Sequence, residues 1–127
     1  MYHGTADPIF SSDDTLAWYK GVLARNGGAP SFARYYPVPG MNHCGSGPST
    51  DQFDMLTALV NWVEKGQAPD SVIGTTRTAA QNPDLGTATL LAATVNPGRT
   101  RPLCPYPKVA RYNGGGSIED AASFACR

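Results

Sequence analysis

Apolar side chains recur at helical spacing in two stretches of the chain. The first begins at Ser11 or Ser12, either of which suits a helix N-cap, and continues to Asn26, before a pair of glycines. The second runs from residue 50 or 51 to a Lys-Gly pair at 65–66. Spacings of three and four residues place on one face of each helix Leu16, Tyr19, Val22 and Leu23, and Phe53, Leu56, Leu59, Val60 and Val63. The pattern predicts two amphipathic helices.

Short runs suited to strands alternate with these helices. Residues 31–38 are rich in aromatic side chains and end at a Pro-Gly pair, and residues 71–76 form a second candidate strand. Residues 3–8 are typical of a tight loop, and the strand expected before them would retain only Met1 and Tyr2. Residues 87–95 are apolar and rich in threonine, and we assign them no structure. The order strand, helix, strand, loop, helix predicts an α/β fold with parallel strands flanked by helices.

The three cysteines are an odd number, so at least one is a free thiol or has a partner outside this chain. Cys104 and Cys126 lie near the two ends of a Pro/Gly-rich tail, and a bridge between them would close a loop of roughly 22 residues, worth about 3 kcal/mol on the chain-entropy model. Cys44 directly follows His43. Because no C-x-x-C or H-x-x-x-H spacing occurs, an oxidising compartment fits better than a zinc site.

Charge and hydropathy make several classes of partner improbable. Ten basic and ten acidic residues cancel, without a Lys/Arg cluster, so neither nucleic acid nor an anionic membrane is expected as a partner. No apolar run approaches the roughly 20 residues that span a bilayer. The first residues lack the charged and apolar regions of a signal peptide. We therefore expect any export signal to lie upstream of this chain.

Two loops carry candidate catalytic side chains. Residues 3–7 and 40–45 each lie where a parallel strand would end, the edge at which functional groups gather in open α/β sheets. In α/β-hydrolases the triad follows the order serine, acid, histidine, and here Asp7 precedes His43 by one helix and one strand. Asp7 would fix the imidazole, and His43 would move the proton. No serine lies in a G-x-S-x-G-like elbow, so the nucleophile is absent.

Four segments together resemble the tannase and feruloyl esterase family. They are the run HGTADP at 3–8, PGMNHCG at 39–45, the helix end NWVEKGQAP at 61–69, and CPYPKVARYNG at 104–114. The resemblance covers nearly all of the chain except about residues 77–100. The His43-Cys44 pair is its most diagnostic element.

The resemblance implies the C-terminal part of a secreted or periplasmic serine esterase with an α/β-hydrolase fold. Residues 1–76 would belong to the catalytic domain, and residues 77–127 would be a loop-rich, disulfide-tied irregular extension packed on it. Asp7 would be the triad acid, His43 the base, Cys104–Cys126 a structural bridge, and Cys44 half of a disulfide whose partner precedes the nucleophilic serine outside this chain. The expected substrate is a small ester of an aromatic acid, such as a hydroxycinnamate, a gallate or a terephthalate monoester.

The resemblance also divides the parts of the site between this chain and the rest of the hydrolase. The serine, most of the oxyanion hole and a lid domain that binds structural calcium would lie in the remainder of the hydrolase chain. No metal or cofactor is expected within residues 1–127. His3 is expected to support its loop through hydrogen bonds, and the aspartates at 13, 14, 51 and 54 to serve the starts of helices.

Two other hypotheses remain open. The chain could be an inactive truncated fragment or a binding module, because it lacks a nucleophile. It could instead come from another α/β-hydrolase of the dienelactone-hydrolase or peptidase type, which would predict no bridge to Cys44.

Overall fold

The computed structural model describes residues 1–28, 31–78, 81 and 96–127. Residues 87–95, for which no structure is predicted, lie outside the described residues. The elements follow in the order β1 (Tyr2–Gly4), α1 (Ser12–Arg25), β2 (Tyr36–Val38), α2 (Met55–Lys65), β3 (Val72–Thr75), β4 (Thr100–Leu103), β5 (Ala110–Tyr112), the 3-10 turn η2 (Ala121–Ser123) and β6 (Phe124–Cys126).

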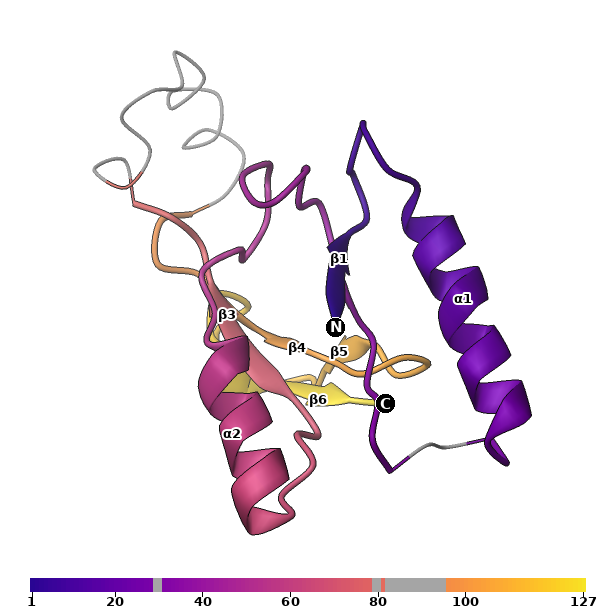
Figure 1. The fold of residues 1–127 in the computed structure, drawn as a ribbon. Coiled ribbons are helices and arrows are strands. Elements are labelled where there is room, and N and C mark those ends of the chain that lie inside the picture. The colour runs from indigo at the N-terminus through magenta and orange to yellow at the C-terminus, as the bar shows by residue number, and fades with distance from the viewer. Residues whose placement is uncertain (29–30, 79–80, 82–95) are drawn as a thin grey trace.

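The β1–α1–β2 unit has the predicted parallel pairing. β1 lies beside β2 in parallel, with Tyr2 opposite Tyr36 and Gly4 opposite Val38. α1 lies alongside these strands, and the segments that follow β1 and β2 leave the pair at the same end (Figure 1). Two expectations need correction, since His3 and Gly4 belong to β1 rather than to the loop, and the strand predicted at 31–38 is regular only over its last three residues.

Local capping explains where the two helices begin and end. Ser11 accepts a hydrogen bond from the amide of Asp13 at the start of α1, as predicted, and Asp54 accepts one from the amide of Thr57 at the start of α2. α2 therefore begins later than the pattern predicted. It ends at Gly66, whose φ of 68° suits glycine.

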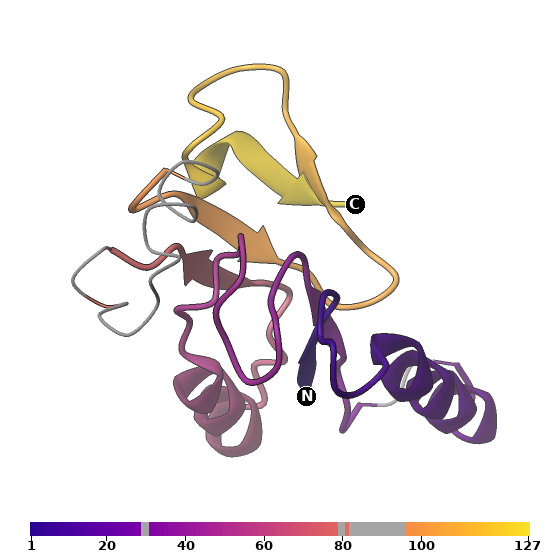
Figure 2. The same ribbon diagram turned by 90° about the horizontal axis from the view of Figure 1, so that it is seen from above.

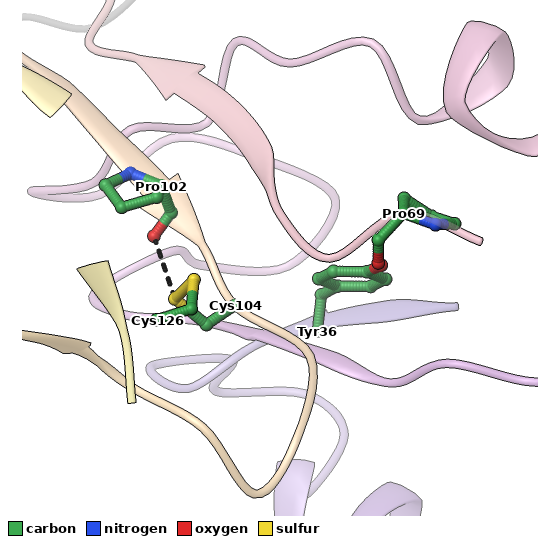
Figure 3. The surroundings of a disulfide bond; sticks show 5 residues. All are labelled: Tyr36, Pro69, Pro102, Cys104 and Cys126. Atoms are coloured by element: carbon green, nitrogen blue, oxygen red, sulfur yellow. Dashed lines mark hydrogen bonds between the residues drawn. A yellow bond between two sulfur atoms is a disulfide. The ribbon is translucent and has the colours of Figure 1, made fainter. Parts of the chain in front are cut away.

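The tail contains regular structure that the sequence analysis described as irregular. β3 and β4 pair antiparallel, and this pair joins the segment before residue 77, where the tail is predicted to begin, to the tail itself. β5 and β6 form a second antiparallel pair within the tail. Seen from above, the tail strands lie on one side and both helices on the other (Figure 2). The predicted Cys104–Cys126 bridge is present and ties the end of β4 to β6 (Figure 3). By the loop-closure argument it stabilises the tail by about 3 kcal/mol.

The core lies where the parallel pair meets β4. It consists of Tyr36, Val38, Met41 and Leu103, with Phe53 and Met55 packed against it. The hydroxyl of Tyr36 donates to the carbonyl oxygen of Pro69 at 2.5 Å (Figure 3). Burial raises the pKa of Tyr36 to about 12, so this phenol stays protonated and keeps its donor role.

The apolar face of α2 points away from this core. Leu56 and Val63 are 71% and 76% exposed, and Leu59 and Val60 are also exposed. These four side chains follow the i, i+3, i+4, i+7 spacing of one helix face, which we call the α2 apolar face. Within the described residues, no helix has both the length and the hydropathy needed to cross a bilayer. The α2 apolar face therefore has the pattern of a packed surface, but it has no partner among the residues that the structure describes.

Candidate active site

Asp7 and His43 meet at one end of the parallel strand pair. Asp7 follows β1 and His43 follows β2, and backbone bonds join the two loops, from the amide of Thr5 to the carbonyl of Val38 and from the amide of Ala6 to that of Met41. Asp7 Oδ2 lies 3.0 Å from His43 Nδ1. The two neighbouring loops thus bring the predicted acid and base into hydrogen-bonding contact.

The carboxylate of Asp7 is held by four donors. Its Oδ1 accepts from the amides of Ile9 at 2.8 Å and Phe10 at 3.0 Å. Its Oδ2 receives His43 Nδ1 and also His3 Nε2, the latter at 3.2 Å. The side chain is only 5% exposed, so almost all of its acceptor capacity is used inside the protein.

These contacts set the charge of Asp7. Desolvation by itself would raise the pKa of Asp7, but the hydrogen bonds from the Phe10 amide, the His43 imidazole and the Ile9 amide outweigh it, and the pKa lies well below its usual range. Asp7 is therefore an acceptor only, which requires His43 Nδ1 to carry a hydrogen. In the neutral imidazole the lone pair is then on Nε2.

The second nitrogen of His43 has no hydrogen-bond partner among the described residues, and the side chain as a whole is 41% exposed. The ring of Phe10 lies beside the imidazole, with centroids 5.3 Å apart. A surface hollow here is lined by Tyr2, His3, Gly4, Asp7, Phe10, Met41, His43 and Cys44. The arrangement can accept a proton from a hydroxyl that approaches through this hollow.

Asp51 fixes the loop that carries His43, a role that the sequence analysis missed. Its Oδ2 accepts from the amide of Ser46 at 2.6 Å and from Nε of Arg77 at 2.7 Å, and its side chain is 2% exposed. Asp51 therefore does not cap α2, contrary to the expectation, whereas Asp54 does. Cys44 and Ser46 have φ of 60° and 65°, and the Asp51 contacts help to hold this left-handed backbone.

The remaining predicted site residues are also placed. Cys44 is a free, exposed thiol in the hollow, whereas Cys104 and Cys126 are bonded to each other. Of the groups that could bind a metal, no three His, Cys, Asp or Glu side chains cluster suitably in the described part of the chain.

Comparison with known proteins identifies one protein family. The model of the family described as "Tannase and feruloyl esterase" matches residues 1–127. The chain is 49% identical over 126 residues to a mono(2-hydroxyethyl) terephthalate hydrolase of Piscinibacter sakaiensis, covering 99% of this chain and 19% of that protein. It is 37% identical over 130 residues to a probable feruloyl esterase of Arthroderma benhamiae, covering 98% of this chain and 22% of that protein.

Solved structures agree with the sequence relatives. The crystal structure of feruloyl esterase B from Aspergillus oryzae matches with a TM-score of 0.71 and 33% identity, over 99% of this chain and 26% of that one. Tannin acyl hydrolase from Aspergillus niger shares the fold, with a TM-score of 0.64 at 19% identity. The chain thus spans about a fifth to a quarter of the length of these relatives. Because the family model matches all of residues 1–127, it favours this family over the dienelactone-hydrolase or peptidase hypothesis. The chain belongs to the tannase and feruloyl esterase family.

Proposed function

We propose that this chain supplies the acid and the base of a Ser-His-Asp triad in a carboxylic-ester hydrolase that acts on esters of aromatic acids. The observation that carries the proposal is the 3.0 Å contact between Asp7 Oδ2 and His43 Nδ1, with no described residue hydrogen-bonded to the other imidazole nitrogen. The ester-hydrolase relatives that match over almost the whole chain support it.

The geometry suits an acyl-enzyme route. A serine hydroxyl attacks the ester carbonyl carbon while His43 Nε2 takes its proton, and the ionised Asp7 stabilises the imidazolium. His43 then returns the proton to the departing alkoxide as the C–O bond breaks, which leaves the acyl group on the serine. Water repeats the sequence, with His43 as base and then acid, and releases the carboxylic acid.

The aromatic substrate class rests on the hollow and on the relatives. Phe10 is 61% exposed and lies beside His43, so an aromatic acyl group that reaches the triad would meet an apolar ring. A terephthalate hydrolase and several probable feruloyl esterases are among the relatives. We therefore place hydroxycinnamates, gallates and terephthalate monoesters ahead of aliphatic esters.

The proposal assigns the serine, most of the oxyanion hole and the lid, with any structural calcium, to another part of the hydrolase chain. That part would cover the α2 apolar face, whose Leu56 and Val63 are largely exposed here. It would also supply the disulfide partner of Cys44, which is free and exposed in this chain. Residues 1–76 would complete the catalytic domain, and residues 77–127 would be packed on it. The Cys104–Cys126 bridge supports an oxidising, secreted or periplasmic location.

The His43→Ala variant of the full-length esterase tests the proposal. We expect hydrolysis of an aryl ester to fall by at least about 10³-fold, because the imidazole moves the proton in both halves of the reaction. The melting temperature should change little, since the His43 side chain is 41% exposed. A variant with unchanged kcat would remove the triad assignment.

A second hypothesis, that the isolated chain is inactive, is favoured by His43 Nε2, to which no described hydroxyl is hydrogen-bonded. A chromogenic aryl-ester assay on the isolated 127-residue chain decides it. We expect no turnover above an otherwise identical His43→Ala chain. Turnover that a fluorophosphonate blocks would refute the inactive-chain hypothesis, because that reagent reacts with an activated serine.

A further inference from the structure

A second imidazole lies on the carboxylate oxygen that His43 uses. His3 Nε2 is 3.2 Å from Asp7 Oδ2, and His3 Nδ1 is 2.7 Å from the hydroxyl oxygen of Thr15 on α1. The His3 side chain is 15% exposed and extends from β1, so the strand and the helix together fix its position. The contacts form a chain from Thr15 through His3 and Asp7 to His43.

The chemistry of these contacts determines which nitrogen of His3 carries the hydrogen. Because the Asp7 carboxylate is ionised and accepts only, His3 Nε2 must donate to it. In the neutral ring Nδ1 then accepts, and the Thr15 hydroxyl is the donor at 2.7 Å. The hydroxyl can also accept if the ring is protonated. The titratable groups that face Asp7 within the described residues are thus His3 from β1 and His43 from the loop after β2.

We propose that His3 is a positioning residue of the triad, which donates from Nε2 to Asp7 Oδ2 and so fixes the carboxylate that orients His43. The role rests on the proposed triad and adds to it a residue that never touches the substrate. Two backbone amides hold Oδ1 of Asp7. Among the described residues, Oδ2 contacts only His43 and His3, so His3 is its one partner besides the catalytic base. Without that partner the carboxylate can rotate away from His43, and its orientation is lost.

A matched pair of amide variants in the full-length esterase tests this role. In His3→Gln the side-chain amide reaches about as far as Nε2, so it can still donate to Asp7. In His3→Asn the amide lies near the position of Nδ1 and reaches Thr15 only. We expect His3→Gln to keep kcat within about threefold and His3→Asn to lose kcat by about 10- to 100-fold, the range expected for sub-ångström to ångström misplacement of a catalytic group. KM should stay nearly unchanged in both variants.

The pH profile separates positioning from simple packing. When the carboxylate rotates away from His43, the imidazolium loses part of its counter-charge, so the acid limb of kcat/KM should move to lower pH in His3→Asn and stay in place in His3→Gln. Equal kcat in wild type and both variants would overturn the proposal, as would equal losses with an unmoved acid limb. The His43→Ala variant distinguishes failure of the proposed triad from failure of the proposed role of His3. If it remains active, the triad itself fails, whereas if it is inactive and both His3 variants are normal, only the role of His3 fails.

Discussion

Gly4 lies directly against the carbonyl oxygen of Met41, so closely that a Cβ on Gly4 would overlap this oxygen and approach that of Asn42. The contact joins the end of β1 to the loop that leads to His43, and both partners are backbone. Neither can move aside as a flexible side chain would. The distance between the Asp7 and His43 loops therefore depends on the absence of a side chain at Gly4.

Gly4→Ala should separate these loops. We expect a loss of about 1–3 kcal/mol in unfolding free energy from overpacking, and a fall in kcat that can approach 100-fold if the loops move by about 1 Å. Gly21→Ala is the matched control, because Gly21 lies inside α1 and the nearest atoms to a Cβ there would be those of the flexible Arg25 guanidinium, at 3.4 Å. It should be neutral or stabilise the protein by about 0.5–1 kcal/mol. Chemical denaturation and aryl-ester kinetics of both variants measure these effects, and equal behaviour would contradict the role of Gly4.

Asp7→Asn should remove the orientation of the base while it preserves shape. An amide in place of the carboxylate can accept from the Ile9 and Phe10 amides, but its NH2 then faces two imidazole nitrogens and must donate to them. His43 would carry its hydrogen on Nε2, where it cannot accept the serine proton. We expect kcat to fall by about 10⁴-fold with KM little changed. Asp14→Asn, on the exposed start of α1, should stay within twofold, and a loss below tenfold for Asp7→Asn would contradict the model of catalysis.

Lowering the pH should destabilise the chain, over a pH range that the pKa values of its carboxylates determine. The bidentate contact with Arg99, at 2.6 and 2.8 Å, lowers the pKa of Glu119 below its ordinary value of 4.5, and hydrogen bonds from Thr57 lower the pKa of Asp54 below 3.8. A carboxyl with a depressed pKa binds its proton less readily in the folded state. Its stabilisation is therefore complete above the unfolded pKa and is lost as pH falls through the folded one.

The melting temperature should accordingly be nearly constant from about pH 7 to 5 and fall below about pH 4.5. Glu119→Gln should lower the melting temperature at neutral pH and make the acid decline shallower, because the variant has no Glu119 charge to lose. Scanning calorimetry across pH 3–7 measures both curves. Parallel curves for wild type and variant would mean that the Arg99 pair contributes nothing to the decline.

Much of the local structure follows from short-range signals in the sequence. Ser11 caps α1, Gly66 ends α2, and the loops after the two parallel strands bring Asp7 to His43, all as predicted. These features depend on residues near in sequence, or on the general rule that parallel strands end at one edge. The Cys104–Cys126 bridge was found through the family resemblance, since three cysteines allow more than one pairing.

The features that the sequence did not predict depend on distant partners. Asp51 is the clearest case, because its contact with Arg77 bridges 26 residues and a carboxylate just before a helix is equally consistent with a cap. The tail strands β4 and β5 gave no alternating pattern, since proline and charged side chains occupy them. His3 is expected from the sequence to support its loop, and its two partners, Thr15 and Asp7, become identifiable only in the folded structure.

Cys44 offers a test of whether another part of the hydrolase docks on this chain. Its thiol is free, exposed and next to His43, while the other two cysteines are bonded to each other. We expect the isolated chain to bind about one equivalent of a maleimide without a reductant, and a Cys44→Ser chain to bind none. In the full-length esterase the proposed disulfide would consume this thiol, so labelling at Cys44 should require prior reduction and should be located there by peptide mass spectrometry. A Cys44 that reacts equally in both proteins without reduction would show that nothing bonds to it, and the loop of the base would then be held without a disulfide, by its backbone bonds and the Asp51 contacts.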